Sequence, residues 1–123
     1  MTDVVVTVPK GMWTEWIEEG DLPGDEASGY ESHFWIPQNA IPMIGVGERV
    51  YIVAHGRLRG YAPLRRWEHR CEMAPSRSCL VRDGEAEAIT VPWAIVGFRG
   101  WRYRWWDRAA EVPFPDWQTE GVA

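Results

Sequence analysis

The sequence has few of the residues on which many metal and enzyme sites depend. Lysine occurs once, at Lys10, and cysteine only twice, at Cys71 and Cys79. The two cysteines are eight residues apart and no C-x-x-C pair occurs, so their spacing does not support a zinc site. The three histidines are scattered along the chain. We therefore expect neither a bound metal nor a cofactor.

The motifs of several enzyme classes are also missing. No glycine-rich phosphate loop, G-x-S-x-G elbow or H-E-x-x-H helix occurs, so nucleotide hydrolysis, esterase and zinc-protease activities have no support. No apolar run approaches the roughly 20 residues of a membrane helix. The opening MTDVVVTVPK is short and has no basic lead, unlike a secretion signal. We expect a soluble, cytoplasmic protein with no membrane partner.

Charge is distributed unevenly along the chain. The net charge is −5, but residues 1–48 carry −8, residues 49–108 carry +6 and residues 109–123 carry −3. The middle segment holds all twelve arginines. Such a segment can form a positive face for a partner that bears phosphates. Alternatively, its arginines pair with the acidic first third of the folded chain.

The stretch RGWRYRWWDR, residues 99–108, combines aromatic rings with four arginines. In an extended strand, Trp101, Tyr103 and Trp105 share one face, and Arg102 and Arg104 share the other. Rings and guanidinium groups bind nucleobases and phosphates, but the same pattern suits a strand that packs its rings in the core. We expect the ring face in the core and the two arginines facing solvent or phosphate.

Local patterns predict strands over most of the chain and one clear helix. The helix is indicated by MWTEWIEEG, residues 12–20, where apolar residues recur at helical spacing. A hairpin is indicated by residues 49–55 and 57–64 around Gly56, and a second one by the Asp83-Gly84 turn between residues 79–82 and 85–91. Further strands are predicted at residues 4–8, 33–36 and 98–106.

These elements predict one domain of the α+β class. We expect a small mixed β-barrel of about six or seven strands with one or two short helices, formed by residues 1–123. Residues 109–123 are expected to be a C-terminal extension. The chain of 123 residues is long enough to bury roughly two thirds of its unfolded surface, as a single domain of this size does.

The segment GVGERVYIVAHGRLRGYAPL, residues 45–64, resembles the central signature of PUA-like folds. In the ASCH and EVE branches a G-D-R-V turn opens a strand and an I-x-G strand follows. Residues 47–50, G-E-R-V, occupy the first part and residues 58–60, L-R-G, the second, while VVVTVPKGMWTEWIEEGD lies where these families place their first strand and helix. The resemblance implies a barrel with a cleft that holds RNA or a modified base beside the first helix.

Some ASCH proteins hydrolyse an acylated cytidine, and the resemblance makes a small amidohydrolase the alternative function. The G-x-K-x-x-x-x-R motif of that family is absent here, since Lys10 precedes Gly11 and the position five residues later is Glu15. If the chain is an enzyme, Lys10 and Thr14 are the candidate catalytic residues. They lie one helical turn apart, and the start of a helix lowers the pKa of a lysine.

The preferred hypothesis is a module that binds nucleic acid or a modified nucleobase through an aromatic pocket flanked by arginines. Its partners would be RNA, single-stranded or modified DNA, or a modified nucleoside. The expected ligand-binding residues are Trp13, Trp16, Trp35 and His55, with Lys10 and Thr14 as polar contacts. The expected phosphate contacts are Arg57, Arg59, Arg102 and Arg104. A protein-interaction module that uses exposed tryptophans is a further alternative.

Overall fold

A computed structural model describes residues 2–8, 10–12, 31–37, 42–68, 77–83 and 87–117. For residues 10, 31–37, 68, 77–79 and 82–83 the description is limited to the backbone. In chain order the elements are β1 (Val4–Thr7), η1 (Lys10–Met12), β2 (Glu31–Pro37), β3 (Arg49–Ala54), β4 (Arg57–Glu68), β5 (Arg77–Asp83), β6 (Ile89–Thr90), β7 (Trp101–Tyr103), η3 (Arg108–Ala110) and β8 (Val112–Pro113).

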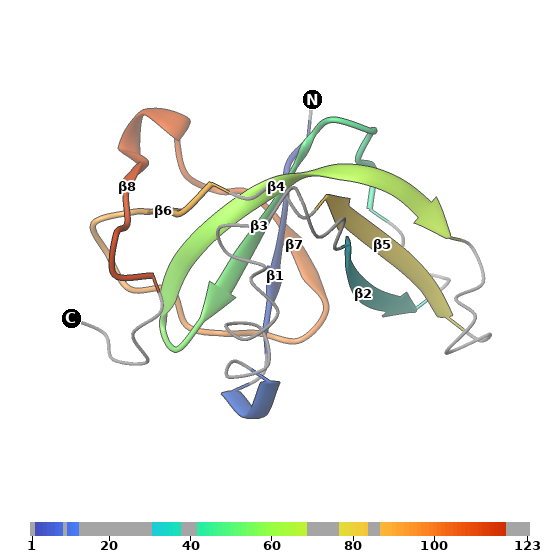
Figure 1. The fold of residues 1–123 in the computed structure, drawn as a ribbon, viewed down its shortest axis with the longest axis horizontal. Helices are drawn as coiled ribbons and strands as arrows, with labels where there is room; N and C mark the ends of the chain where they lie inside the picture. The colour runs from blue at the N-terminus through green and yellow to red at the C-terminus, as the bar shows by residue number, and fades with distance from the viewer. Residues whose placement is uncertain are drawn as a thin grey trace.

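Six of the strands form one curled sheet with the order β2-β5-β4-β3-β1-β7 (Figure 1). The long strand β4 arches across the molecule, pairing with β3 along its first part and with β5 along its second. β1 runs parallel to β3 and antiparallel to β7. A separate two-stranded sheet joins β6 to β8. The expected strand-rich, barrel-like architecture is confirmed at this level.

The predicted hairpin around Gly56 is confirmed as β3 and β4. His55 (φ 47°) and Gly56 (φ 74°) are both left-handed, as a two-residue hairpin turn requires. Ile52 pairs with Gly60 and Val53 with Leu58, so the intervening residue of β4 is an extra one and forms a bulge. The bulge therefore falls at Arg59, next to Gly60.

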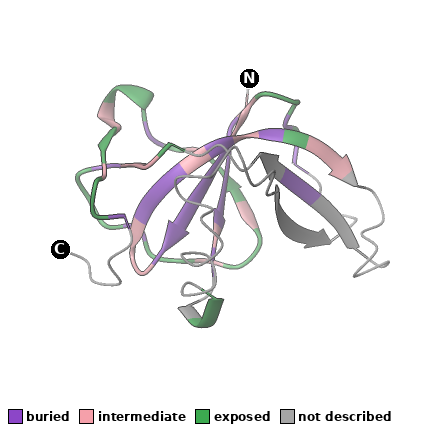
Figure 2. Cartoon of the chain, viewed as in Figure 1, coloured by how far each residue is buried: buried purple, intermediate pink, exposed green. Residues whose placement is uncertain are grey.

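Both faces of the sheet are buried at its centre. On β1, Val4 and Val6 pack into one apolar cluster and Val5 packs into the other. β3 repeats the pattern, with Ile52 in the first cluster and Tyr51 in the second. Successive side chains of a strand point to opposite sides, which explains the alternation. Figure 2 shows the buried residues along β1 and β3 and over much of β4.

The predicted pairing around Asp83-Gly84 is wrong. β5 ends at Asp83, but it pairs with β2 on one side and with β4 on the other. Residues 89 and 90, expected to be its hairpin partner, pair with β8 instead. The Asp83-Gly84 turn signal does not decide the pairing of β5. β4 continues to Glu68, and its second part provides the edge with which β5 pairs.

Helix is limited, in the described chain, to the two 3-10 turns η1 and η3. The helix predicted for residues 12–20 lies outside the described residues except at its start, where η1 is found. No helix of the described part is long and apolar enough to cross a membrane. Residues 109–117, expected to belong to an extension, contribute β8. Their Trp117 packs into the same apolar cluster as Val4 and Val6.

Candidate functional site

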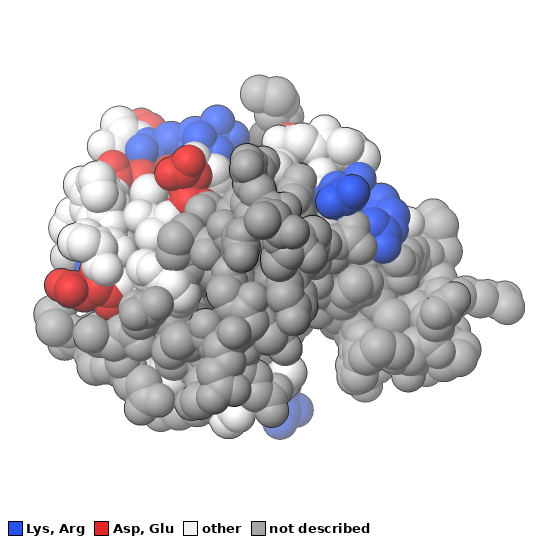
Figure 3. Space-filling view, in the orientation of Figure 1, with Lys and Arg blue, Asp and Glu red and all other residues white. Residues whose placement is uncertain are grey.

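On the face shown in Figure 3, the described basic side chains stand in separate groups, and one group lies beside acidic side chains. Positive charge alone therefore does not locate a site there. A more specific combination is an exposed arginine in contact with aromatic rings, because guanidinium groups bind phosphates and rings stack on bases.

Phe98, Arg102 and Trp105 make this combination, and we call them the arginine–aromatic surface. The Arg102 Cζ atom lies 4.4 Å from the centroid of the Phe98 ring. The rings of Phe98 and Trp105 meet edge to face, with centroids 6.2 Å apart. Arg102 is exposed, and 50% of Trp105 is accessible to solvent. A ligand at this surface would meet the exposed indole of Trp105. Next to it lies the Arg102 guanidinium, which is positioned by its contact with the Phe98 ring.

The expected ring alternation ends before Trp105. Trp101 and Tyr103 are neighbours, with ring centroids 4.7 Å apart, whereas Trp105 contacts Phe98 and Trp106. β7 stops at Tyr103, so the strand does not reach the position where the third ring should join the others. The expected core position is therefore wrong for Tyr103 and Trp105, which are exposed; only the half-buried Trp101 packs against the core.

Trp105 is exposed because both of its neighbours are bound to the interior. The Arg104 Nε atom donates to the Asp3 carboxylate at 3.0 Å, and the Arg104 backbone N–H donates to the Asp3 carbonyl oxygen at 3.0 Å. The Trp106 indole N–H donates to Glu111 at 2.9 Å, and only 5% of Trp106 is exposed. With the residues before and after it held inward, Trp105 is directed to the surface.

The Glu111 carboxylate is the centre of a buried polar cluster that includes the Trp106 indole. It accepts hydrogen bonds from the Tyr51 hydroxyl at 2.6 Å and from Arg49 Nη1 at 2.9 Å, besides the one from Trp106. Burial and the hydrogen bond to Glu111 raise the pKa of Tyr51. The phenol therefore stays protonated and serves as a fixed donor. The Arg49 guanidinium also lies over the ring of Tyr61, 4.0 Å from its centroid.

Asp3 ties the start of the chain to the arginine-rich segment. Its carboxylate, 2% exposed, accepts from Arg108 Nη2 at 2.8 Å, from Arg104 Nε at 3.0 Å and from the Arg49 backbone N–H at 2.9 Å. Burial by itself would raise the pKa of Asp3, but the hydrogen bonds from Arg108, the Arg49 backbone and Arg104 outweigh it and lower the pKa. Asp3 is thus ionised at neutral pH.

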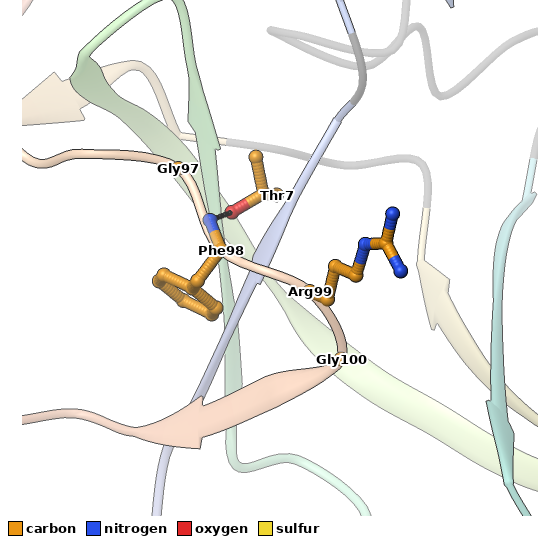
Figure 4. Close-up of a pocket in the computed structure, with 5 residues that line it drawn as sticks. All are labelled: Thr7, Gly97, Phe98, Arg99 and Gly100. Carbon is orange, nitrogen blue, oxygen red and sulfur yellow. Dashed lines mark hydrogen bonds between the residues drawn. The ribbon is translucent and has the colours of Figure 1, made fainter.

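A pocket of about 530 Å³ opens beside the arginine–aromatic surface, at the end of β1. It is lined by Thr7 and by the loop of residues 97–100 (Figure 4). The backbone N–H of Phe98 donates to the Thr7 hydroxyl oxygen at 3.2 Å and fixes the loop to the strand. Phe98 belongs to both features, since its ring contacts Arg102 and its backbone lines the pocket.

Gly100 sets the turn between the pocket and β7, and its φ of +73° is left-handed. A Cβ atom at Gly100 would meet no atom within 4 Å, so only the backbone conformation opposes a side chain. We expect Gly100→Ala to lower the free energy of unfolding by about 1 kcal/mol, measured by urea denaturation.

Gly11→Ala is the matched control, because a Cβ there also meets no atom within 4 Å and its φ is not positive. Its stability should stay the same or rise by up to about 1 kcal/mol. Equal losses in both variants would contradict a conformational role for Gly100.

The arginines predicted as phosphate contacts fall in different environments. Arg102 is part of the arginine–aromatic surface, and Arg104 forms the buried ion pair described above. Arg57 is half-buried, and its Nη2 atom donates to the Thr90 hydroxyl at 3.2 Å and to the Val91 carbonyl oxygen at 3.0 Å. Only Arg102 among these three presents its guanidinium group at the surface beside aromatic rings.

Arg59 lies inside the protein, with an exposed fraction of 0%. Its Nε atom donates to the Ala54 carbonyl oxygen at 2.9 Å and its Nη1 atom to that of Trp117 at 3.0 Å. Burial and the nearby charge of Arg57 lower the pKa of Arg59 to about 10, so it stays charged at neutral pH. A phosphate at the surface does not reach this group, which joins β4 to the C-terminal residues.

The remaining predicted residues lie largely outside the described chain. Three of them fall wholly outside it: Trp13, Thr14 and Trp16. Lys10 begins η1 and Trp35 lies in β2, each without a described side chain. His55 is half-buried in the turn between β3 and β4. Whether these residues share a cleft stays a prediction.

Sequence reasoning did not single out Phe98 or Arg99, and it assigned Trp105 to the core. A signal was present, because Gly97 and Gly100 enclose a phenylalanine and an arginine in G-F-R-G, which overlaps the start of the arginine-rich stretch. Two glycines so close together are typical of a loop with little side-chain cover, which leaves the residues between them accessible.

No protein-family model, curated protein or solved structure matches the chain. Within the described residues, no three histidine, cysteine, aspartate or glutamate side chains are placed to hold a metal ion.

Proposed function

We propose that this chain binds single-stranded nucleic acid, RNA or DNA, through the arginine–aromatic surface, and that its curled sheet is of the PUA-like type. The observation that carries the proposal is the exposed indole of Trp105, held next to the stacked pair of Arg102 and Phe98. Exposed rings next to arginines are the combination by which proteins bind single strands with little sequence preference.

The charges around the surface fit this ligand. Arg99 and Arg102 are exposed, and neither forms an ion pair with any residue in the described part of the chain. Arg104 and Arg108, by contrast, are engaged with Asp3. Two guanidinium groups in this segment are therefore available to phosphates, while the other two hold the segment in place.

The net charge of −5 limits how much of the binding energy can come from long-range attraction. A polyanion is repelled by the chain as a whole and attracted only locally. Stacking on Trp105 must then supply a large share of the affinity, and few counterions are released. The proposal accordingly predicts measurable but modest salt dependence.

Titration of labelled oligothymidine and oligouridine, followed by fluorescence anisotropy at two salt concentrations, tests the proposal. With two phosphate contacts and a slope of about 0.7 per contact for single strands, affinity should fall about sevenfold between 50 and 200 mM salt. The proposal is contradicted if neither oligonucleotide binds saturably at 50 mM salt, or if affinity is the same at both concentrations.

The other two functions stay predictions. An amidohydrolase requires Lys10 and Thr14 to face a common cavity, and neither side chain is among those described. A protein-interaction module would use exposed tryptophans, but the contact between Arg102 and Phe98 beside Trp105 favours a ligand that carries both bases and phosphates.

A further inference from the structure

In the pocket at the end of β1, the loop lies close to the Thr7 side chain at Gly97. A Cβ atom on Gly97 would lie 3.0 Å from Thr7 Cγ2, which is tighter than an ordinary contact, so the two atoms would have to move apart by a few tenths of an ångström. Glycine at this position lets the Phe98 N–H reach the Thr7 hydroxyl oxygen. The pocket wall is therefore a built contact between β1 and the loop of residues 97–100.

The pocket presents two hydrogen-bond donors on the same side of the loop. The Thr7 hydroxyl oxygen accepts from Phe98, which leaves its own hydrogen to be donated. Thr7 and Arg99 extend to one side of the loop, and the ring of Phe98 extends to the other (Figure 4). No described residue accepts a hydrogen bond from the Thr7 hydroxyl or the Arg99 guanidinium group.

Donors of this kind are suited to a phosphate group. Hydroxyl groups, arginine side chains and backbone N–H groups supply most of the phosphate contacts in nucleic-acid complexes. Gly97 and Gly100 have no side chains to keep a ligand from the backbone. The pocket volume of about 530 Å³ is in the range of small-ligand sites, large enough for a phosphate and the sugar attached to it.

We propose that the pocket formed by Thr7 and residues 97–100 is a phosphate site, with Arg99 and the Thr7 hydroxyl as its donors. The inference rests on the proposed function for the source of the phosphate, which is the backbone of the strand that stacks on Trp105. Phe98 connects the two features: its ring belongs to the stacking surface and its backbone to the pocket wall. The nucleic-acid strand is thereby held at two points, on opposite sides of the loop of residues 97–100.

Removal of the Arg99 charge tests the site. Arg99→Gln should reduce the affinity for oligothymidine severalfold at 50 mM salt and lower the salt slope by about 0.7, the amount expected for one lost phosphate contact. Arg65→Gln, which removes an exposed arginine on β4, is the matched control and should leave both quantities unchanged. Thr7→Val should weaken binding and Thr7→Ser should restore it, because serine keeps the hydroxyl.

A second measurement separates this inference from the proposed function. Inorganic phosphate is titrated into ¹⁵N-labelled protein, and the amide resonances of Gly97, Arg99 and Gly100 should shift in the unmodified chain but not in Arg99→Gln. If oligonucleotide binds and Arg99→Gln behaves like the unmodified chain, the phosphate site is overturned and the proposed function stands.

If phosphate shifts these resonances but no oligonucleotide binds, the site is supported with free phosphate as its source, and the proposed function is overturned. If the resonances do not shift and no oligonucleotide binds, both are overturned.

Discussion

Asp3→Ala is expected to lower the free energy of unfolding by about 3 kcal/mol, the lower end of the cost of breaking a buried ion pair. The Asp3 carboxylate is 2% exposed and receives four hydrogen bonds, two of them from Arg108. Its removal leaves the half-buried guanidinium of Arg104 without its anion. The lower end of the range applies because Arg108 is 43% exposed and water can replace its partner. Urea denaturation at pH 7 measures the loss.

Glu87→Ala is the control for this prediction, because Glu87 is an exposed acid. Its stability should change by no more than about 0.5 kcal/mol. If Asp3→Ala is as mild as Glu87→Ala, Asp3 does not hold the arginine-rich segment in place.

The contribution of Asp3 to the free energy of unfolding also depends on pH, and its direction can be predicted. The pKa of Asp3 is lowered in the folded protein, so folding favours the ionised carboxylate. The stabilisation is complete above the ordinary pKa near 3.8 and disappears as the pH falls through the lowered value. The difference in unfolding free energy between the unmodified chain and Asp3→Ala should therefore be constant from pH 5 to 7 and shrink below about pH 4. A difference that grows in acid would contradict this assignment.

Trp105→Ala is expected to weaken oligonucleotide binding by about 5- to 150-fold, the range for one stacked base. Trp105 is the most exposed ring of the arginine–aromatic surface, and its removal also takes an edge-to-face partner from Phe98. Anisotropy titration at 50 mM salt measures the loss. Stability should fall by no more than about 1 kcal/mol, because half of the side chain is already in water.

Trp93→Ala is the matched control, since Trp93 is 43% exposed but has no place in the arginine–aromatic surface. Its affinity for the oligonucleotide should stay within twofold of the unmodified chain. Equal losses in the two variants would show that tryptophan content, and not this surface, governs binding.

The parts of the fold that the sequence predicts correctly are those decided by neighbours along the chain. The run of valines in β1 and the hairpin around Gly56 depend on local propensity and turn chemistry, and both are found in the structure. Strand pairing over long separations is not decided locally. β5 lies between β2 and β4, and the Asp83-Gly84 signal gives no information about either partner.

Local sequence pattern also fails to predict where the aromatic rings of the arginine-rich segment lie. Strict alternation in the sequence predicts that Trp105 follows Trp101 and Tyr103 to one face. β7 ends at Tyr103, and beyond it Arg104 bonds to Asp3 and Trp106 bonds to Glu111. Asp3 precedes Arg104 by about one hundred residues, so no local pattern reveals that contact. The exposure of Trp105 follows from these anchors.

The most direct test of the account is an NMR titration of the tryptophan indole N–H resonances with oligothymidine. The proposed binding mode predicts that the Trp105 resonance shifts in proportion to bound oligonucleotide. The Trp106 resonance, whose N–H is bonded to the buried Glu111, should move little. An oligonucleotide that binds while the Trp105 resonance stays in place would contradict the arginine–aromatic surface as the binding site.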